Sequence, residues 1–542
     1  MKLHKQMKPI ALAVIGMGTI APAVAFDDIK FDNGMVFESR LTSTYTLSSR
    51  LEDRDRVLSG KNNASGNDGN NNFDKGALTS NRVSLLLDTR LRKGDSGLVV
   101  SASTFYDDVY HRSNDNDGAS FPNKIGGAAD EFTRDARHYH GGYTRLLDAY
   151  GYTGFDVGSE GHATVRLGKH VVSWGESLFI PGISGAQGPA DGTKAGIPGT
   201  EVKDQLLPED QISALYEVND KLSLMAQWQY NWHKTLVNAP GSFMSTSDVV
   251  GPGAACLQPG PVCTVPRRAG ESPSKTGQWG VGAKYRLTNE TEVGLIYLNY
   301  SDRAPMVDIN YLDPAGPSFR HHYFDDIKML GATFSTSFGI ATLGGEISYR
   351  KDAPALVNTK VNLGRSTPLW VQLPTATKAD VLQTNINTFV NLGRTFLAPQ
   401  ANFLAEIAYT SVSNPEARRV PGATATTNRF GITPLSDDLN FGSYGLAFAS
   451  TLSLTYPGII ENWELGVPIS YSHQLAGRTL QGNLGMGEGD HRLSIGATMT
   501  YRRNFQIGLT YLGYFGNASL GPVRNRLLTD RDQVSLVAKY TF

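Results

Sequence analysis

Two things are scarce in this sequence: cysteine and long apolar runs. Cys256 and Cys263, in the stretch CLQPGPVC, are the only cysteines among 542 residues. Zinc usually takes four ligands and no histidine lies near this pair, which argues against a zinc site there. In an oxidising compartment the two cysteines are expected to close a small disulfide loop, with two free thiols as the alternative. Beyond the first 25 residues, no segment reaches the roughly 18 consecutive apolar residues of a membrane helix.

An excess of basic charge is also missing. Lys and Arg number 50 against 51 Asp and Glu, so the formal net charge is −1. This balance gives no support to a nucleic-acid partner. Charged residues make up 19%, whereas glycine reaches 58 and tyrosine and phenylalanine reach 23 each. Such a composition is typical of many short strands that carry aromatic side chains and are joined by glycine-containing turns.

The first residues have the pattern of a secretory signal. Three early lysines precede the apolar stretch IALAVIGMGTIAPAVA, and Ala23 and Ala25 satisfy the small-x-small cleavage rule. We therefore expect a cleaved signal peptide at 1–25 and a single domain at 26–542. A membrane anchor is the alternative, although Pro22 and the shortness of the stretch disfavour it.

Apolar and polar residues alternate through most of the remaining chain, as in KLSLMAQWQYNW and RLSIGATMTYR. This period of two predicts strands with one apolar and one wet face. Eighteen strands are expected, near 35–50, 79–92, 97–110, 143–157, 161–172, 209–219, 221–233, 277–289, 291–302, 322–337, 340–351, 379–394, 399–412, 442–456, 462–474, 489–503, 505–516 and 531–542.

The connections between the expected strands alternate between short turns and long polar loops. The long loops are expected near 51–78, 111–142, 173–208, 234–276, 303–321, 352–378, 413–441, 475–488 and 517–530. This sorting predicts an all-β, transmembrane antiparallel barrel of a Gram-negative outer membrane, with about 18 strands and long extracellular loops. A soluble sandwich or propeller is the alternative, but nothing in those folds requires short and long connections to alternate.

The final ten residues, QVSLVAKYTF, alternate up to Phe542. We expect this last strand to close the barrel against the first, because an open edge inside hydrocarbon leaves backbone groups unsatisfied. A terminal aromatic of this kind resembles the signal that the barrel assembly machinery reads. Outer-membrane lipid and lipopolysaccharide are the other expected partners.

Charged side chains are expected on the inner face of the barrel. They are Arg82, Asp88, Arg90, Arg166, Glu346, Arg350, Glu406, Glu464, Arg492 and Arg502. A barrel of this size holds an aqueous or plugged lumen, so these charges either face water or pair with one another.

The connection at about 173–208 differs from the other long loops because it is rich in apolar residues, among them Trp174, Phe179 and Ile180. Apolar side chains favour burial, so the loop is expected to fold into the lumen as a constriction; a cap on the outer rim is the alternative. The first long loop, SGKNNASGNDGNNNF, is instead rich in oxygen atoms. It could hold calcium, but its spacing matches no defined site, so no metal site is predicted from it.

The segments RLGKHVVSWGESLFIPGISGAQ and IPGTEVKDQLLPEDQIS resemble the hallmark of a proteobacterial family known as domain of unknown function 1302. The resemblance covers essentially the whole mature chain. It implies an outer-membrane protein linked with resistance-nodulation-division (RND) exporters and periplasmic lipid-carrier-like proteins, and hence traffic of hydrophobic or lipid-like molecules. The matching positions are Gly168, Trp174, Gly175, Glu176, Pro198, Gly199 and Pro208.

Physical chemistry suggests roles for some of these side chains. A carboxylate in an apolar loop needs a partner, so Glu176 is expected to pair with an arginine of the lumen wall, Arg166 being one candidate. Trp174 is expected to pack against the wall. The expected ligand and constriction residues are Trp174, Glu176, Phe179, Ile180, Arg166, Glu346 and Arg350.

The leading functional hypothesis is an outer-membrane channel or carrier for hydrophobic or amphipathic small molecules or lipids, gated or constricted by the inward loop. A general polar diffusion porin is the alternative, and a cargo-free adhesive barrel is a third possibility. An enzyme is not expected, because none of the strand-borne histidines (His162, His170, His321, His322, His473 and His491) lies in a recognisable nucleophile motif. No cofactor is expected.

Overall fold

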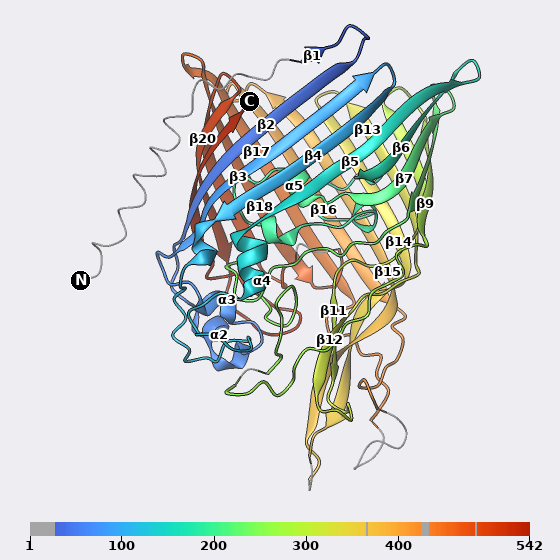
Figure 1. Cartoon of the computed structure of the whole chain (residues 1–542). Helices are drawn as coiled ribbons and strands as arrows, with labels where there is room; N and C mark the ends of the chain where they lie inside the picture. Colours follow the sequence, from blue (N-terminus) through green and yellow to red (C-terminus); the bar gives the residue numbers. More distant parts are fainter. Residues whose placement is uncertain (1–27, 259, 365–366, 424–432, 483–484) are drawn as a thin grey trace.

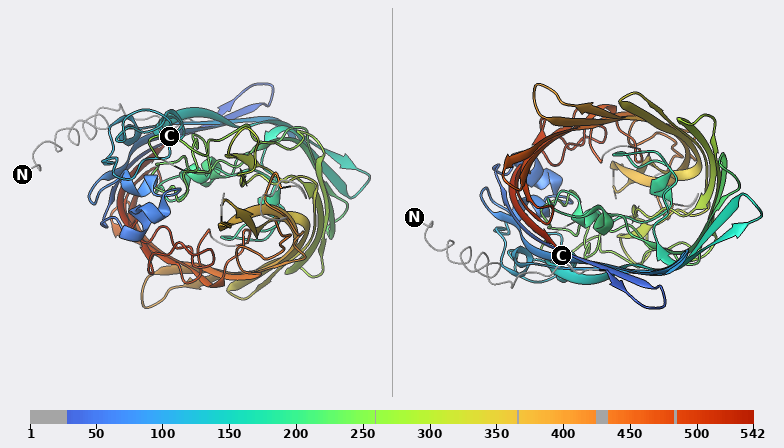
Figure 2. Two further views of the ribbon diagram at one scale, coloured as in Figure 1. Left: turned by 90° about the horizontal axis from the view of Figure 1, so that it is seen from below. Right: turned by 90° about the horizontal axis from the view of Figure 1, so that it is seen from above.

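A computed structural model describes residues 28–258, 260–364, 367–423, 433–482 and 485–542. The expected signal peptide at 1–25 lies outside the described residues. In the described part, eighteen antiparallel strands close into a barrel, which Figure 2 shows as an oval wall viewed along its axis. The predicted closed antiparallel barrel is confirmed.

The barrel strands lie close to their expected positions. They are β2 (Val36–Arg50), β3 (Leu78–Lys93), β4 (Ser96–Asp107), β5 (Gly142–Val157), β6 (Gly161–His170), β7 (Glu209–Glu217), β8 (Leu222–Gln229), β9 (Gln278–Arg286), β10 (Thr291–Tyr300), β13 (Ile327–Phe338), β14 (Ala341–Asn362), β15 (Trp370–Gly393), β16 (Gln400–Ser413), β17 (Tyr444–Ile460), β18 (Trp463–Gly477), β19 (His491–Tyr501), β20 (Phe505–Phe515) and β21 (Gln533–Thr541). The two-residue strand β1 (Ile29–Lys30) adds only a short hairpin to β2.

The first and last barrel strands form the closing seam. β2 pairs with β21 from Thr42 opposite Thr541 to Arg50 opposite Gln533. Ser48 and Ser535 are register partners, and their hydroxyl oxygens lie 2.7 Å apart. Closure gives the backbone groups of both strands partners within the sheet, which hydrocarbon cannot supply.

The wall has its apolar side outside. On β14, Ile347 and Tyr349 are exposed, whereas the alternating Glu346, Ser348 and Arg350 are buried on the inner side. A soluble domain would bury the first pair and expose the others, so this inversion fits a wall that faces lipid.

Aromatic side chains gather near the ends of the strands. Trp228 and Trp279, both exposed, lie at the end of β8 and the start of β9, and Trp463 begins β18. The rings of Trp463 and Tyr501 are 5.1 Å apart between their centroids. Such amphipathic rings suit the depth of lipid headgroups.

The long loops extend from one end of the barrel, the lower end in Figure 1, and are here called the outer loops. They contain the short helices α2 (Arg56–Ser59), α3 (Asp68–Asn71) and α4 (Arg134–Ala136), helical turns at 61–63, 108–111 and 137–141, and the hairpin of β11 (Met306–Asn310) and β12 (Ser318–His322). Among the described residues, no helix is long and apolar enough to cross a membrane.

Two strands run further than the sequence analysis expected. The loop predicted at 352–378 is mostly a continuation of β14 and β15, which pair up to Asn362 opposite Trp370. The register shifts between Arg350 and Ala353, where Asp352 has a φ of +63°. Beyond this bend the ladder continues outside the barrel wall, and one of its faces, with Val361 and Leu373, packs against Val420 of another outer loop.

The disulfide between Cys256 and Cys263 is present, in the outer loop 230–277. Arg502, expected on the inner face, lies instead in the turn between β19 and β20, with a φ of +44°.

Candidate functional site

The segment 171–208, which joins β6 to β7, is here named the plug loop. It lies inside the barrel, where Figure 2 shows chain crossing the interior, and it bonds to strands on several sides of the wall. It contains helical turns at 184–186 and 192–194 and the short helix α5 (Val202–Gln205). The expected inward fold is therefore confirmed, and the alternative of an outer cap is wrong.

Glu346 of β14 holds one stretch of the plug loop through backbone amides. Its carboxylate accepts N–H donors from Glu176 at 2.6 Å, Ser177 at 3.2 Å and Ile183 at 2.7 Å. The side chain is only 3% exposed. A Cβ added at Gly182 would lie 1.6 Å from Glu346 Oε1, so a side chain there would have to displace this carboxylate from its amide donors.

Glu406 of β16 holds the neighbouring stretch in the same way. Its Oε2 accepts the backbone N–H groups of Leu178 at 3.1 Å and of Ile180 at 3.0 Å. It also accepts the backbone N–H of Phe179, which lies between them. Its Oε1 accepts the side-chain amide of Asn385 at 2.7 Å. The sequence placed Glu406 on the inner face but gave no sign of this role; the only available signal was a carboxylate at an inward position of a strand.

The apolar side chains of this half of the plug loop pack against small residues of the wall. Ile180 is fully buried beside Ala408 and Ala447. Trp174 is buried in a cluster with Ile183, and a Cβ added at Gly280 would come within 3.1 Å of the Trp174 ring. Small wall residues thus leave the space that the plug loop fills.

Arg350 secures the same region from β14. Its guanidinium donates to the Gly182 carbonyl at 3.2 Å and to Gln383 at 2.9 Å. Of the predicted site residues, the structure therefore brings together Trp174, Glu176, Phe179, Ile180, Glu346 and Arg350.

The predicted partner of Glu176 is wrong. Its carboxylate pairs with Lys284 of β9 at 3.0 Å, and Lys284 also contacts Glu292 at 3.1 Å. Arg166 lies on β6 with an exposed side chain. The sequence could not show whether Glu176 pairs with Lys284 or with Arg166, because β9 is brought close to Glu176 only by the tertiary fold.

The second half of the plug loop is held by ion pairs to the opposite part of the wall. Asp191 accepts from Arg145 at 2.8 Å and from the Tyr143 hydroxyl at 2.7 Å, both on β5. The remaining pairs are Lys203 with Asp148 at 2.9 Å and with Asp88, Glu201 with Lys539 at 2.6 Å, and Lys194 with Asp204 at 3.8 Å inside the loop. These contacts reach β3, β5 and β21, so the plug loop is fixed on both sides of the lumen.

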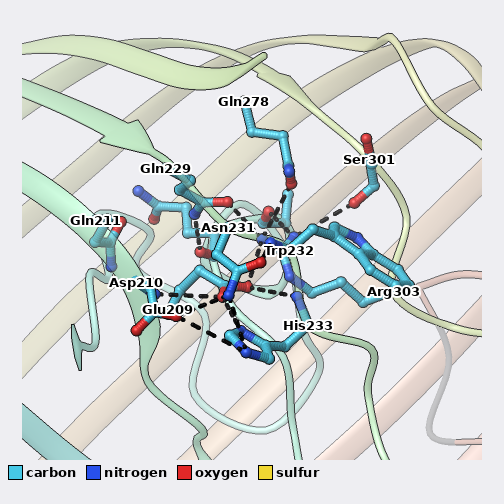
Figure 3. Close-up of polar contacts among 12 residues, drawn as sticks. Glu209, Asp210, Gln211, Gln229, Asn231, Trp232, His233, Gln278, Ser301 and Arg303 are labelled. Carbon is cyan, nitrogen blue, oxygen red and sulfur yellow. Dashed lines mark hydrogen bonds and ion pairs between the residues drawn. The ribbon is translucent and has the colours of Figure 1, made fainter. Parts of the chain in front are cut away.

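A third anchor, drawn in Figure 3, centres on Arg303 from the connection 301–326. Its guanidinium is buried and donates to Gln229 at 2.7 Å, to the carbonyl of Ala186 in the plug loop at 3.0 Å, and pairs with Glu209 at 3.4 Å. His233 also bonds Glu209 in this group (Figure 3). The connection 301–326 therefore contacts the plug loop. No sequence motif predicts this contact.

Three large apolar side chains of the plug loop stay exposed although they lie within the barrel. Leu178 and Leu206 are each 48% exposed and Val202 is 68% exposed. Leu207, the neighbour of Leu206, is buried against wall residues Leu86 and Leu147, so Leu206 points away from the wall.

The wall formed by β17, β18 and β19 has a small, polar inner face. Its inward residues that are partly exposed include Thr451, Ser453, Ser470, Ser472, Ser494 and Thr498. The inner side of the barrel therefore carries hydroxyl groups on this wall and exposed apolar side chains on the plug loop. Within the described ranges, no group of three or more His, Cys, Asp or Glu side chains could hold a metal ion.

Several solved outer-membrane proteins are similar to this chain in fold. OccAB4 of Acinetobacter baumannii is 11% identical, with 94% of this chain and 100% of that chain covered and a TM-score of 0.41. A BenF-like porin from Pseudomonas fluorescens Pf-5 is 10% identical, with 93% and 98% covered and a TM-score of 0.41. The outer membrane channel DcaP of Acinetobacter baumannii is 10% identical, with 95% and 100% covered and a TM-score of 0.38.

A comparison with curated proteins finds no match. The family model described as "Protein of unknown function (DUF1302)" matches residues 6–542. This match spans the whole barrel and the plug loop, including the Trp-Gly-Glu segment at 174–176. The chain therefore belongs to the DUF1302 family.

Proposed function

We propose that this protein is an outer-membrane channel for hydrophobic or amphipathic small molecules, constricted by the plug loop. The observation that carries the proposal is the exposure of Leu178, Val202 and Leu206 inside the barrel. Covering apolar surface is worth about 25 cal/mol per Å². An apolar group of a passing molecule would gain this by resting on the three side chains.

The polar inner face of β17 to β19 supports an amphipathic cargo. Its hydroxyl groups, such as those of Thr451 and Ser470, can meet a polar head while the plug loop meets an apolar chain. Exchange of cargo with an RND-type exporter or a periplasmic lipid-carrier-like protein stays a prediction.

The experiment measures binding of dansylated undecanoic acid, a fluorescent amphiphile, to the purified protein in detergent. The variant carries Leu178→Ser, Val202→Ser and Leu206→Ser together. The control carries Val57→Ser and Val262→Ser, two exposed apolar residues of outer loops. We expect the triple variant to lose most of the binding and the control to retain it.

A general polar porin is the second candidate, favoured by the hydroxyl-bearing inner face of β17 to β19. Single-channel recording in planar bilayers separates the two. A large, steady, ohmic conductance together with equal amphiphile binding by all three proteins would support the polar porin and refute the proposal.

A further inference from the structure

Three outer loops meet beyond the end of the barrel from which the long loops extend, and they share a small core. The loops 51–77, 108–141 and 230–277 contribute Phe73, Tyr110, Phe132 and Phe243 to one buried apolar cluster. Two carboxylates, Asp68 and Asp248, lie next to this core on two of the loops. A Cβ added at Gly241 would come within 3.8 Å of Asp68 Cβ, which shows how closely the first and third loops approach.

The two carboxylates are joined through backbone amides. Asp248 Oδ2 accepts the N–H of Asp68 at 3.0 Å, and Asp68 Oδ2 accepts the N–H of Asn123 at 2.8 Å. Asp68 is 5% exposed and Asp248 is fully buried. One residue from each of the three loops therefore takes part in the same arrangement.

Each of these carboxylates keeps one oxygen atom without a hydrogen-bond partner. Asp68 Oδ1 and Asp248 Oδ1 are both buried and unbonded. The amide oxygens of Asn67 and Asn123 are also buried and unbonded, on side chains that are each 1% exposed. Asn123 is bonded to Asp68 through its backbone N–H, and Asn67 precedes Asp68 in the chain, so the four residues are neighbours. Buried polar atoms normally have partners, so an unbonded group of this size points to a ligand.

Among the described residues, no cation forms an ion pair with Asp68 or Asp248, although Arg531, whose Nε and Nη1 have no hydrogen-bond partner, opposes the rise in the pKa of Asp248. The Lys124 ammonium donates to the carbonyls of Ala128, Ala129 and Glu131. Arg531 pairs with Asp530 at 3.4 Å. Burial raises the pKa of Asp68, and the charge of Asp248 raises it further; burial likewise raises the pKa of Asp248, to about 6. Near neutral pH, the ionised form of each carboxylate is therefore less stable than that of a carboxylate exposed to water.

We propose that Asp68 and Asp248, with the amide oxygens of Asn67 and Asn123, bind a calcium ion that ties the three outer loops together. Calcium takes six to eight oxygen ligands in flexible geometry, including carboxylates, amide carbonyls and water. Two carboxylates neutralise its charge. The four proposed ligand atoms are oxygens, which disfavours zinc and other metals that prefer nitrogen or sulfur, and the amide nitrogen of Asn123, which is also unbonded, is not a metal ligand.

The first test is isothermal titration of the full-length mature protein in detergent with calcium chloride at pH 7.5, with magnesium chloride as the comparison ion. We expect one calcium site on the unsubstituted protein and weaker binding of magnesium, which demands a stricter octahedral geometry. The absence of calcium binding to the folded, unsubstituted protein would overturn the proposal without any variant having to fold.

The second test compares Asp68→Asn and Asp248→Asn with Glu52→Gln, an exposed carboxylate of the same first loop. We expect calcium affinity to fall by more than about tenfold in both Asp variants, the loss typical of removing a partner at a metal site. Glu52→Gln should bind as the unsubstituted protein does. Equal affinity in all four proteins would place calcium elsewhere, and this result too would overturn the proposal.

Discussion

At Gly182 the plug loop comes so close to the barrel wall that a side chain there would have to displace the Glu346 carboxylate. A Cβ there would lie 1.6 Å from Glu346 Oε1, whereas one at Gly188 of the same loop would meet only the Leu207 carbonyl at 3.4 Å. Neither glycine has a positive φ, so the difference between them is one of space rather than of backbone conformation. The two positions therefore form a matched pair.

We predict that Gly182→Ala displaces the 174–183 stretch from Glu346 and raises the single-channel conductance. The overpacking costs about 1–3 kcal/mol, comparable to the strength of the contacts that hold the stretch. Gly188→Ala should leave the conductance unchanged. Equal conductance of both variants would show that Gly182 is not a point of tight docking.

A second residue-scale prediction concerns pH. His140, in the helical turn 137–141 of an outer loop, is fully buried, and its Nε2 accepts the Ala239 N–H at 3.1 Å. Burial lowers the pKa of His140 to about 3. The unfolded histidine takes up a proton below about pH 6.5 while the folded one does not. Its contribution to stability is therefore full above pH 6.5 and falls as the pH decreases toward 3.

The measurement is the difference in unfolding free energy between the unsubstituted protein and His140→Asn, which cannot titrate. We expect that difference to decrease by about 2 kcal/mol between pH 7.5 and pH 5. Thermal unfolding in detergent at several pH values gives the trend. A difference that stays constant would mean that His140 is protonated in the folded protein.

Among the elements, the plug loop shows which structural features a sequence pattern can predict and which it cannot. Its apolar content predicted correctly that 173–208 enters the lumen, because burial of those side chains depends on composition alone. Its anchors were not predictable in the same way. Glu406 and Lys284 lie far away along the chain, and only the barrel topology brings them to the loop.

The strands also include parts that the sequence predicted and a part that it did not. Period-two alternation located the barrel strands because lipid on one side and the lumen on the other impose it on every crossing. It failed for 352–378, where β14 and β15 continue past the barrel wall and bury Val361 and Leu373 against Val420 of an outer loop, a contact that only the tertiary fold provides. Asp352, with its positive φ, lies at the register shift where the wall passes into this extension.

The element-scale prediction is that Glu406→Ala loosens the plug loop while the barrel stays folded. Three backbone N–H groups, at residues 178, 179 and 180, lose their acceptor, and each unsatisfied donor costs about 1–3 kcal/mol if it stays buried. The stretch should therefore leave the wall, and the single-channel conductance should rise. Glu464→Gln is the control, since Glu464 is an exposed residue of β18.

A folded barrel is recognised by its faster migration on unboiled gels, so loosening can be separated from unfolding. If Glu406→Ala migrates as folded and conducts no more than Glu464→Gln, the carboxylate does not hold the constriction.

For the molecule as a whole, the seam between β2 and β21 converts a sheet into a closed barrel. Ser48 and Ser535 face each other across it, are both buried, and are separated by 487 positions. Opposite residues in an antiparallel pair have Cα atoms about 4.5–5.5 Å apart, within the range that a disulfide spans. The pair Ser48→Cys and Ser535→Cys should therefore oxidise readily in the folded protein and join the two ends of the barrel covalently.

The product should migrate faster than its reduced form on a boiled, denaturing gel, because the cross-link keeps the unfolded chain compact. Ser48→Cys with Ser494→Cys is the control: β20 and β21 stand between β19 and β2, so these two positions are not neighbours. The native disulfide at Cys256 and Cys263 closes only a short loop and shifts both proteins alike. If the two double variants oxidise at the same rate, β2 and β21 do not meet in this register, and the lumen that encloses the plug loop is not sealed as described.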